Sequence, residues 1–268
     1  MLRYALYFLI LITAAVPALG SDDTLDVREL DGESLHFTVF WTGIPAAEAA
    51  LCAEASGTDR MHFTTRAKSF PVVQLLYPLD SRIDSEVIIP GMTPTVFKKG
   101  GREGWGRQYG KRVVFDLVSG KSLYYRDDAL KNTMDVPPEV QDPLSCLYLF
   151  RVTPLKDGDT LKIKIGDGSK MLDSTVKIIG REKVTVPAGT FDTIMVEPTM
   201  EGVGGIFAKS PGARLFLWLT DDKWKRPVKM YSKVRVGDFT AVLERLGPKG
   251  SCEPQTAGVS PVLVESQQ

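Results

Sequence analysis

The chain has 268 residues, of which 43% are hydrophobic and 9% aromatic, enough for one substantial core. This composition excludes an intrinsically disordered chain. The 33 basic and 33 acidic residues balance, so no broad field is available to attract nucleic acid or an anionic membrane.

Residues 1–20 have the features of a cleaved secretory signal peptide. A short basic start precedes the uncharged run YALYFLILITAAV, and the small residues Ala18 and Gly20 stand before the segment SDD. The run from Tyr4 to Val16 is shorter than the roughly 20 residues that a membrane-spanning helix needs, so an uncleaved anchor is the weaker alternative. We therefore predict a periplasmic protein without a stable transmembrane span.

Most of the following chain alternates apolar and polar residues at period two. This pattern predicts strands with one buried face in LHFTVFW (35–41), MHFTTRAKS (61–69) and TLKIKIG (160–166). Turn sequences near Gly120 and Gly168 predict tight hairpins. Three further strands are expected in ARLFLWLTDD, RPVKMYSKVRV and FTAVLERL near the end. We count roughly ten to twelve strands in all.

Helix is predicted at two places only. PVVQLLYP (71–78) is compatible with a short helix. DPLSCLYLFR (142–151) is the stronger candidate, because Asp142 suits the N-cap and Pro143 suits the first helical position. Leu144, Leu147 and Tyr148 then form one apolar stripe along this helix.

The three cysteines, Cys52, Cys146 and Cys252, are an odd number for an exported protein. One disulfide is compatible with this count, but the sequence does not assign its partners. Buried free thiols are the favoured interpretation for Cys52 and Cys146. The wide spacing of the cysteines matches no zinc site.

The sequence pattern divides the chain into four parts. Residues 1–20 are the signal peptide, 21–29 an N-terminal lead, and 30–246 a single β-rich domain. Residues 247–268 lose the alternation and gain Gly, Pro, Ser and Gln, which predicts a disordered tail.

The adjacent Ser145 and Cys146 invite a nucleophile interpretation, which needs a base such as histidine. The chain has only His36 and His62, both on predicted strands, and no G-x-S-x-G segment surrounds the serine. We therefore expect Ser145 to lie in the first helical turn and Cys146 to pack. No catalytic residue, cofactor motif or metal-ligand cluster is recognised, so we predict a protein that is not an enzyme.

Three other segments have competing interpretations. Asp221 and Asp222 could bind a hard cation or serve an unusual hydrolase, but a solvated turn is favoured. KKGGREGWGRQYG and EGVGGIF lack the phosphate-loop form and are expected to be a hairpin and a flexible loop. The cations around Trp224 in DDKWKRPVKM could touch lipid headgroups, but an edge strand protected by lysines is favoured.

Three motifs in order resemble a bacterial family of exported proteins known only as a domain of unknown function. They are Asp-Pro-Leu-Ser at 142–145, Gly-Thr-Phe at 189–191 and Trp-Leu-Thr-Asp-Asp at 218–222, and the similarity covers about residues 30–246. The resemblance implies a periplasmic β-rich protein. It is also loosely similar to the half-open barrels that carry lipoproteins across the periplasm.

The expected fold is therefore mainly β, a strongly curved antiparallel sheet or open barrel with one or two short helices. The expected function is binding of a lipid or another hydrophobic ligand, with a lipoprotein or outer-membrane component as partner and no nucleic acid. The alternative is a structural or assembly factor of the cell envelope with a filled core. The candidate ligand-binding residues are Leu144, Leu147, Tyr148, Leu217 and Trp218.

Overall fold

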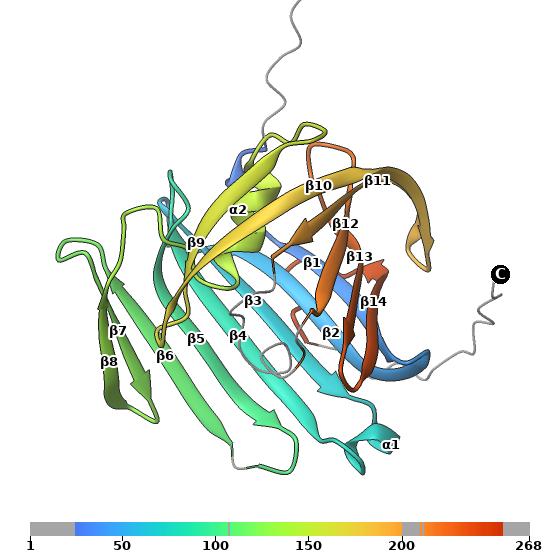
Figure 1. Cartoon of the computed structure of the whole chain (residues 1–268), viewed down its shortest axis with the longest axis horizontal. Coiled ribbons are helices and arrows are strands. Elements are labelled where there is room, and N and C mark those ends of the chain that lie inside the picture. Colours follow the sequence, from blue (N-terminus) through green and yellow to red (C-terminus); the bar gives the residue numbers. More distant parts are fainter. Residues whose placement is uncertain (1–24, 107, 200–209, 211, 254–268) are drawn as a thin grey trace, which may run out of the picture.

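The computed structural model describes residues 25–106, 108–199, 210 and 212–253. Within them the chain forms one antiparallel sheet of 14 strands with two short α-helices (Figure 1). The first elements are η1 (Val27–Leu30), β1 (Glu33–Trp41), β2 (Ile44–Ala55), β3 (Arg60–Ser69), α1 (Pro71–Gln74), β4 (Leu79–Ile88), β5 (Thr93–Glu103), β6 (Tyr109–Asp116), β7 (Lys121–Arg126) and β8 (Ala129–Asp135). The later ones are α2 (Ser145–Val152), β9 (Thr160–Gly166), β10 (Met171–Val186), β11 (Gly189–Pro198), β12 (Arg214–Thr220), β13 (Pro227–Val234) and β14 (Gly237–Leu246).

The sheet runs in the order β8-β7-β6-β5-β4-β3-β2-β1-β14-β13-β12-β11-β10-β9. Strands that are adjacent in the sheet are also consecutive in the sequence, except for β1 and β14. The pairing of β1 with β14 joins the two halves of the sheet, β1–β8 and β9–β14. The sheet curves until the β9–β10 turn meets β6, β7 and β8, where Asn132 donates to the carbonyl of Gly168 at 3.1 Å. A Cβ at Gly168 would lie 2.6 Å from Val113, so only glycine allows this approach. The predicted curved sheet or open barrel is confirmed.

The strand count exceeds the predicted ten to twelve because polar strands escape the period-two pattern. The strand β8 (ALKNTMD) is largely exposed along its length, so it has no apolar face to recognise. The predicted hairpins at Gly120 and Gly168 are present, as are the three C-terminal strands and the short helix at Pro71. The glycine-rich segment around Gly101 forms the β5–β6 hairpin, as expected, whereas EGVGGIF lies outside the described residues.

Two clusters of buried side chains hold the fold together. The main core collects buried residues of η1, β1–β6 and α2, among them Leu35, Phe63 and Val113, together with a few from β10, β12, β13 and β14. The second core surrounds Phe150 of α2 with residues of β9–β12: Ile163, Val176, Ile178, Ile194, Val196 and Leu219. Because each core contains residues of α2, the helix lies between the two halves of the curved sheet.

The two ends of the sheet differ. At one end, here called the α2 end, β1 and β3 begin and α2 packs inside. At the other, four neighbouring turns come together (Figure 1). We call this end the turn rim and define it by the turns β1–β2, β3–β4 with α1, β5–β6 and β13–β14.

The predicted boundaries of the domain need correction at both ends. Leu25 and Val27 belong to the main core, so the segment 21–29 is not a mere lead. The predicted tail does not begin at residue 247, because Gly247 donates its backbone N–H to the carbonyl of Ser34 at 2.8 Å. Cys252 is bonded to Cys52, with the two Cα atoms 5.8 Å apart. The signal peptide and residues 254–268 lie outside the described residues.

The disulfide overturns the expectation that Cys52 is a free thiol. The sequence could not assign the pair because 200 residues separate the two cysteines. Cys52 lies on β2 in the main part of the sheet, and the chain after β14 returns alongside β1 and β2 to meet it. Only Cys146 stays unbonded among the three cysteines.

The expectation that DDKWKRPVKM forms an edge strand was wrong. The strand β13 pairs with both β12 and β14, so it lies inside the sheet. The lysines have internal contacts instead. Lys223 pairs with Glu29 at 2.7 Å, and Lys225 donates to the carbonyl of Arg151 at 3.1 Å. The true edges are β8 and β9, where Lys131, Lys162 and Lys164 discourage pairing with another chain.

We predict that Cys252→Ala lowers the free energy of unfolding by about 2–4 kcal/mol, because the disulfide closes a long loop in the unfolded chain. Denaturant unfolding of the oxidised protein measures this loss. Cys146→Ala is the matched control and should cost no more than about 1 kcal/mol. Equal stability of wild type and Cys252→Ala under oxidising conditions would show that the bond does not contribute.

Candidate functional site

The start of α2 is built around the fully buried carboxylate of Asp142. One oxygen, Oδ1, accepts the backbone N–H groups of Leu144 at 2.7 Å and Ser145 at 2.8 Å. The other, Oδ2, accepts the hydroxyl of Ser85 on β4 at 2.5 Å. Burial raises the pKa of Asp142 to about 6, against the opposing effect of these hydrogen bonds. Asp142 therefore serves the helix start, as predicted, and also ties it to the sheet.

The position of the helix differs slightly from the prediction. The regular helix begins at Ser145, and Pro143 lies in the turn before it rather than at its first position. The carboxylate of Asp142 spans this turn and reaches the first free N–H groups of the helix. The predicted capping role is thus performed from outside the helix.

Ser145 and Cys146 have the surroundings of structural residues. The hydroxyl of Ser145 is buried and accepts the backbone N–H of Asp142 at 2.9 Å. Burial raises the pKa of Cys146 to about 12, which opposes formation of the reactive thiolate. Neither histidine is beside them: His36 hydrogen-bonds Ser34 and His62 hydrogen-bonds Asp84.

The three candidate ligand residues on α2 pack into the main core. Tyr148 is fully buried, stacks on Phe63 with the ring centroids 3.6 Å apart, and donates its hydroxyl to the carbonyl of Cys52 at 2.9 Å. Leu144 is buried in the same core, and Leu147 packs against it. The helix thus fills this end of the sheet.

Leu217 and Trp218 lie on opposite faces of β12. Leu217 packs against the second core. Trp218 belongs to the main core, donates its indole N–H to Glu182 of β10 and has the ammonium of Lys229 4.7 Å from its ring. The structure therefore does not bring the five candidates together around one space. Their role in binding a ligand stays a prediction.

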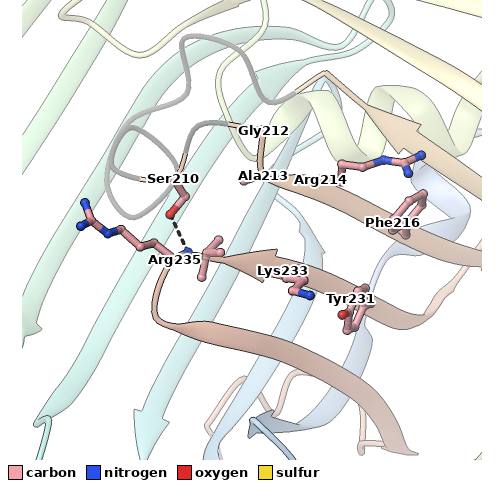
Figure 2. Close-up of a pocket in the computed structure, with 9 residues that line it drawn as sticks. Ser210, Gly212, Ala213, Arg214, Phe216, Tyr231, Lys233 and Arg235 are labelled. Atoms are coloured by element: carbon pink, nitrogen blue, oxygen red, sulfur yellow. Dashed lines mark hydrogen bonds between the residues drawn. The ribbon is translucent and has the colours of Figure 1, made fainter.

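An open pocket of about 530 Å³ lies farther along β12 and β13 (Figure 2). Its walls are aromatic and cationic, because Phe216 faces Tyr231 across the ladder and Arg214 faces Lys233. The lining residues are Ser210, Gly212, Ala213, Arg214, Phe216, Tyr231, Lys233, Val234 and Arg235. The pocket lies at the turn rim, since β12 begins and β13 ends there.

The cations of this pocket are of two kinds. Arg214 pairs with Glu197 of β11, with N–O distances of 2.5 and 2.9 Å, and lies over the ring of Phe216. Within the described residues, neither Lys233 nor Arg235 has an ion-pair partner, although both line the pocket. The backbone N–H of Arg235 is bonded to the buried hydroxyl of Ser210 at 3.0 Å, which fixes the position of its main chain. The arrangement suits a molecule with an apolar part and an anionic group.

Sequence reasoning missed these residues, although a signal was present. In RLFLWL and YSKVR, cations and aromatic rings recur at every second position, so they share one face of each strand. The leucines of RLFLWL lie on the opposite face of that strand, and their apolar pattern is the more conspicuous of the two. Only the pairing of β12 with β13 places the two patterns side by side.

The described residues contain no group of three histidine, cysteine or acidic side chains that could hold a metal ion. Asp221 pairs with Arg181 at 2.7 Å. Asp222 accepts the backbone N–H groups of Trp224 and Lys225, which is the hydrogen bonding of a turn. The predicted turn is confirmed, and both carboxylates make contacts typical of structural residues.

These features define a protein with an open, strongly curved antiparallel barrel that holds one helix. The chain belongs to the DUF3108 family of proteins of unknown function, whose model matches residues 36–244. The match confirms the resemblance to an uncharacterised domain family. A comparison with curated proteins found no match. In the described part of the chain, no helix is long and apolar enough to cross a membrane.

Solved structures resemble the chain at low identity. A beta-barrel-like protein of the DUF1849 domain of unknown function from Brucella abortus is 12% identical, with a TM-score of 0.47. The alignment covers 81% of this chain and 96% of the other. A protein of Parabacteroides distasonis, described as a candidate lipoprotein, is 13% identical with a TM-score of 0.35, covering 81% and 95%.

We predict that Asp142→Asn removes a pH dependence of stability. The pKa of Asp142 is raised to about 6 in the folded protein, so its protonated form favours folding. Its contribution is complete below the unfolded pKa near 4 and is lost as the pH rises through about 6. Measured by urea unfolding, wild type should lose about 2–3 kcal/mol relative to Asp142→Asn across this window.

Asp142→Ala is the companion variant. It leaves the hydroxyl of Ser85 and two helix N–H groups without their acceptor, so it should cost about 2–4 kcal/mol at neutral pH. Asparagine keeps an acceptor for both N–H groups and offers a donor to Ser85. A pH profile of Asp142→Asn parallel to that of wild type would contradict the burial of a titrating carboxylate here.

Proposed function

We propose that this protein is an exported, non-enzymatic binding protein that holds an amphipathic anion, such as a lipid with a phosphate or carboxylate group. The pocket at the turn rim supports this proposal most directly. Its volume of about 530 Å³ is within the range of about 300–1,000 Å³ typical of small-molecule sites. It combines aromatic walls with cations, which is the chemistry such a ligand requires.

Each part of the pocket has a distinct role in the proposal. The rings of Phe216 and Tyr231 provide apolar contact for a chain. Lys233 and Arg235 attract the anionic group, because neither is in an ion pair within the described residues, although Asp238 faces Lys233 in the ladder. Arg214 is held by Glu197 and stacked on Phe216, so it shapes the wall more than it binds charge.

The compartment has support of its own. The Cys52–Cys252 disulfide suits an oxidising compartment, because the cytosol keeps most thiols reduced. It agrees with the signal-like sequence of residues 1–20. Both features favour the periplasm as the site of function.

A second function, that of an envelope assembly factor, is favoured by a different observation. The α2 end has no room for a ligand beside Tyr148, whose ring is fully buried and stacked on Phe63. Apolar side chains are exposed elsewhere on the molecule, as a partner surface would require. The binding experiment below separates the two functions.

We predict that the exported protein binds decyl phosphate more tightly than the neutral decyl glucoside in isothermal titration, with both ligands kept monomeric. Replacing Lys233 and Arg235 together by Gln should weaken binding of the phosphate about tenfold or more, because two charged contacts are lost. Lys121→Gln, on the distant strand β7, is the matched control.

Two results would contradict the proposal. One is the absence of binding by either ligand, which would favour the assembly factor. The other is binding of decyl phosphate that the double variant leaves unchanged, which would place the ligand elsewhere.

A further inference from the structure

The exposed apolar side chains of the described residues gather at one end of the molecule. Fourteen large hydrophobic residues have an exposed fraction of 38% or more. Eight of these fourteen lie at the turn rim, where the exposed fractions range from 39% to 76%. These eight are Trp41, Ile44, Val72, Leu75, Leu76, Tyr77, Trp105 and Val236. Such a concentration differs from the scattered single residues that are normal on a protein surface.

The sheet order makes these residues one continuous row. The strands β6, β5, β4, β3, β2, β1, β14 and β13 are successive neighbours, so the four turns of the rim stand side by side (Figure 1). Hydrogen bonds link adjacent turns at two points. Trp105 donates its indole N–H to the carbonyl of Leu76 at 3.1 Å, and Trp41 donates to the carbonyl of Val236 at 2.9 Å.

The β3–β4 turn and the two rim tryptophans leave few unbonded polar groups that would resist entry into an apolar phase. Both indole N–H groups are already bonded. In the β3–β4 turn, Leu76 and Tyr77 donate their backbone N–H groups to the carbonyl of Val73, and Gln74 donates its amide to the carbonyl of Ser69. No charged residue occurs from residue 70 to residue 79. Internal satisfaction of donors is what burial in lipid demands.

Cations stand directly behind this apolar row. Lys68 and Arg102 face Asp80 from its two sides in the ladder, and both are exposed. Lys233 and Arg235, also exposed, lie beside the β13–β14 turn. Carboxylates also stand here, since Glu48 faces Lys68 and Asp238 faces Lys233 in the ladder. Against Asp80, Glu48 and Asp238 the four cations leave one net positive charge, which favours an anionic headgroup layer.

We infer that the turn rim is a docking surface for a phospholipid bilayer that contains anionic lipids. The leucine, isoleucine and valine side chains enter the acyl boundary, and the tryptophan and tyrosine rings lie at the headgroup level, where such rings are favoured. The cations behind them contact phosphate groups. Exposed apolar residues beside bonded indole donors, with cations behind them, match the layered chemistry of a bilayer surface.

This docking surface goes beyond the proposed ligand site and does not depend on it. The pocket opens at the same end, so docking would bring its entrance to the membrane. The two proposals share Lys233 and Arg235, yet they fail separately, because docking depends on the apolar turns whereas ligand binding depends on Phe216, Tyr231 and these two cations.

The test is sedimentation of the exported protein with vesicles of equal parts phosphatidylethanolamine and phosphatidylglycerol. Wild type should bind, and binding should weaken at high salt or when phosphatidylcholine replaces phosphatidylglycerol. Leu75→Ser combined with Leu76→Ser should reduce the partition coefficient about tenfold or more, because two apolar side chains no longer enter the bilayer. All variants share the same N-terminus, so their differences report the rim.

Val118→Ser is the matched control, since Val118 is fully exposed in the β6–β7 turn at the opposite end of the sheet. It should bind as wild type does. Trp105→Leu keeps the apolar surface, so it should retain binding but lose part of the blue shift of tryptophan emission on vesicles. Unfolding curves confirm that each variant is folded.

Three results would overturn the inference. The first is wild type that does not bind the vesicles, and the second is equal binding by wild type and the double leucine variant. The third is a dimer of wild type in solution that the leucine variants dissociate, which would assign the rim to a second copy of the chain. The pocket variant lacks two of the four cations, so it should lose decyl phosphate binding but weaken vesicle binding less than the double leucine variant does, because its apolar turns are unchanged.

Discussion

The arrangement depends on how α2 is held inside the curved sheet. Arg151 on the helix is fully buried and pairs with Glu33 of β1 through two N–O contacts of 2.6 and 2.9 Å. Its third bond goes to the carbonyl of Trp224 in the β12–β13 turn. A buried ion pair of this kind adds little net stability, but removal of one partner leaves an uncompensated charge. It therefore fixes the position of the helix relative to both halves of the sheet.

This constraint decides where a ligand can be held. Asp142 fastens one end of α2 to β4, and Arg151 fastens the other to β1 and the β12–β13 turn. Between them Tyr148 and Phe150 fill the space on either side of the helix with the two cores. The α2 end is thus filled by side chains, whereas the pocket and most of the exposed large apolar residues lie at the turn rim.

Local features of the fold were predictable from sequence because they depend on residues close together in the chain. The period-two alternation in LHFTVFW predicted the strand β1, and Asp142 before an apolar stripe predicted the helix α2. Features that require distant partners were not predictable. The bond between Cys52 and Cys252 and the interior position of β13 both follow from the pairing of β1 with β14, which no local pattern reveals.

The candidate site shows the same division. Leu144 and Tyr148 were correctly placed on one apolar face, but whether that face meets core or ligand depends on Phe63, far earlier in the chain. The cations and rings of the pocket become neighbours only when β12 lies beside β13. The sequence of the β3–β4 turn, FPVVQLLYPL, is apolar enough to suggest a core. It is exposed because it lies beyond the ends of the strands.

The structure has an end filled by side chains opposite the apolar rim for which we infer membrane docking. Hydrogen exchange measured by mass spectrometry, with and without vesicles containing phosphatidylglycerol, tests this division most directly. If the rim docks on the membrane, vesicle binding slows exchange in segments 41–44, 72–77, 104–106 and 235–237 and leaves α2 and the β6–β7 turn unchanged. Protection confined to α2, or bound protein without protection of these four segments, would contradict it.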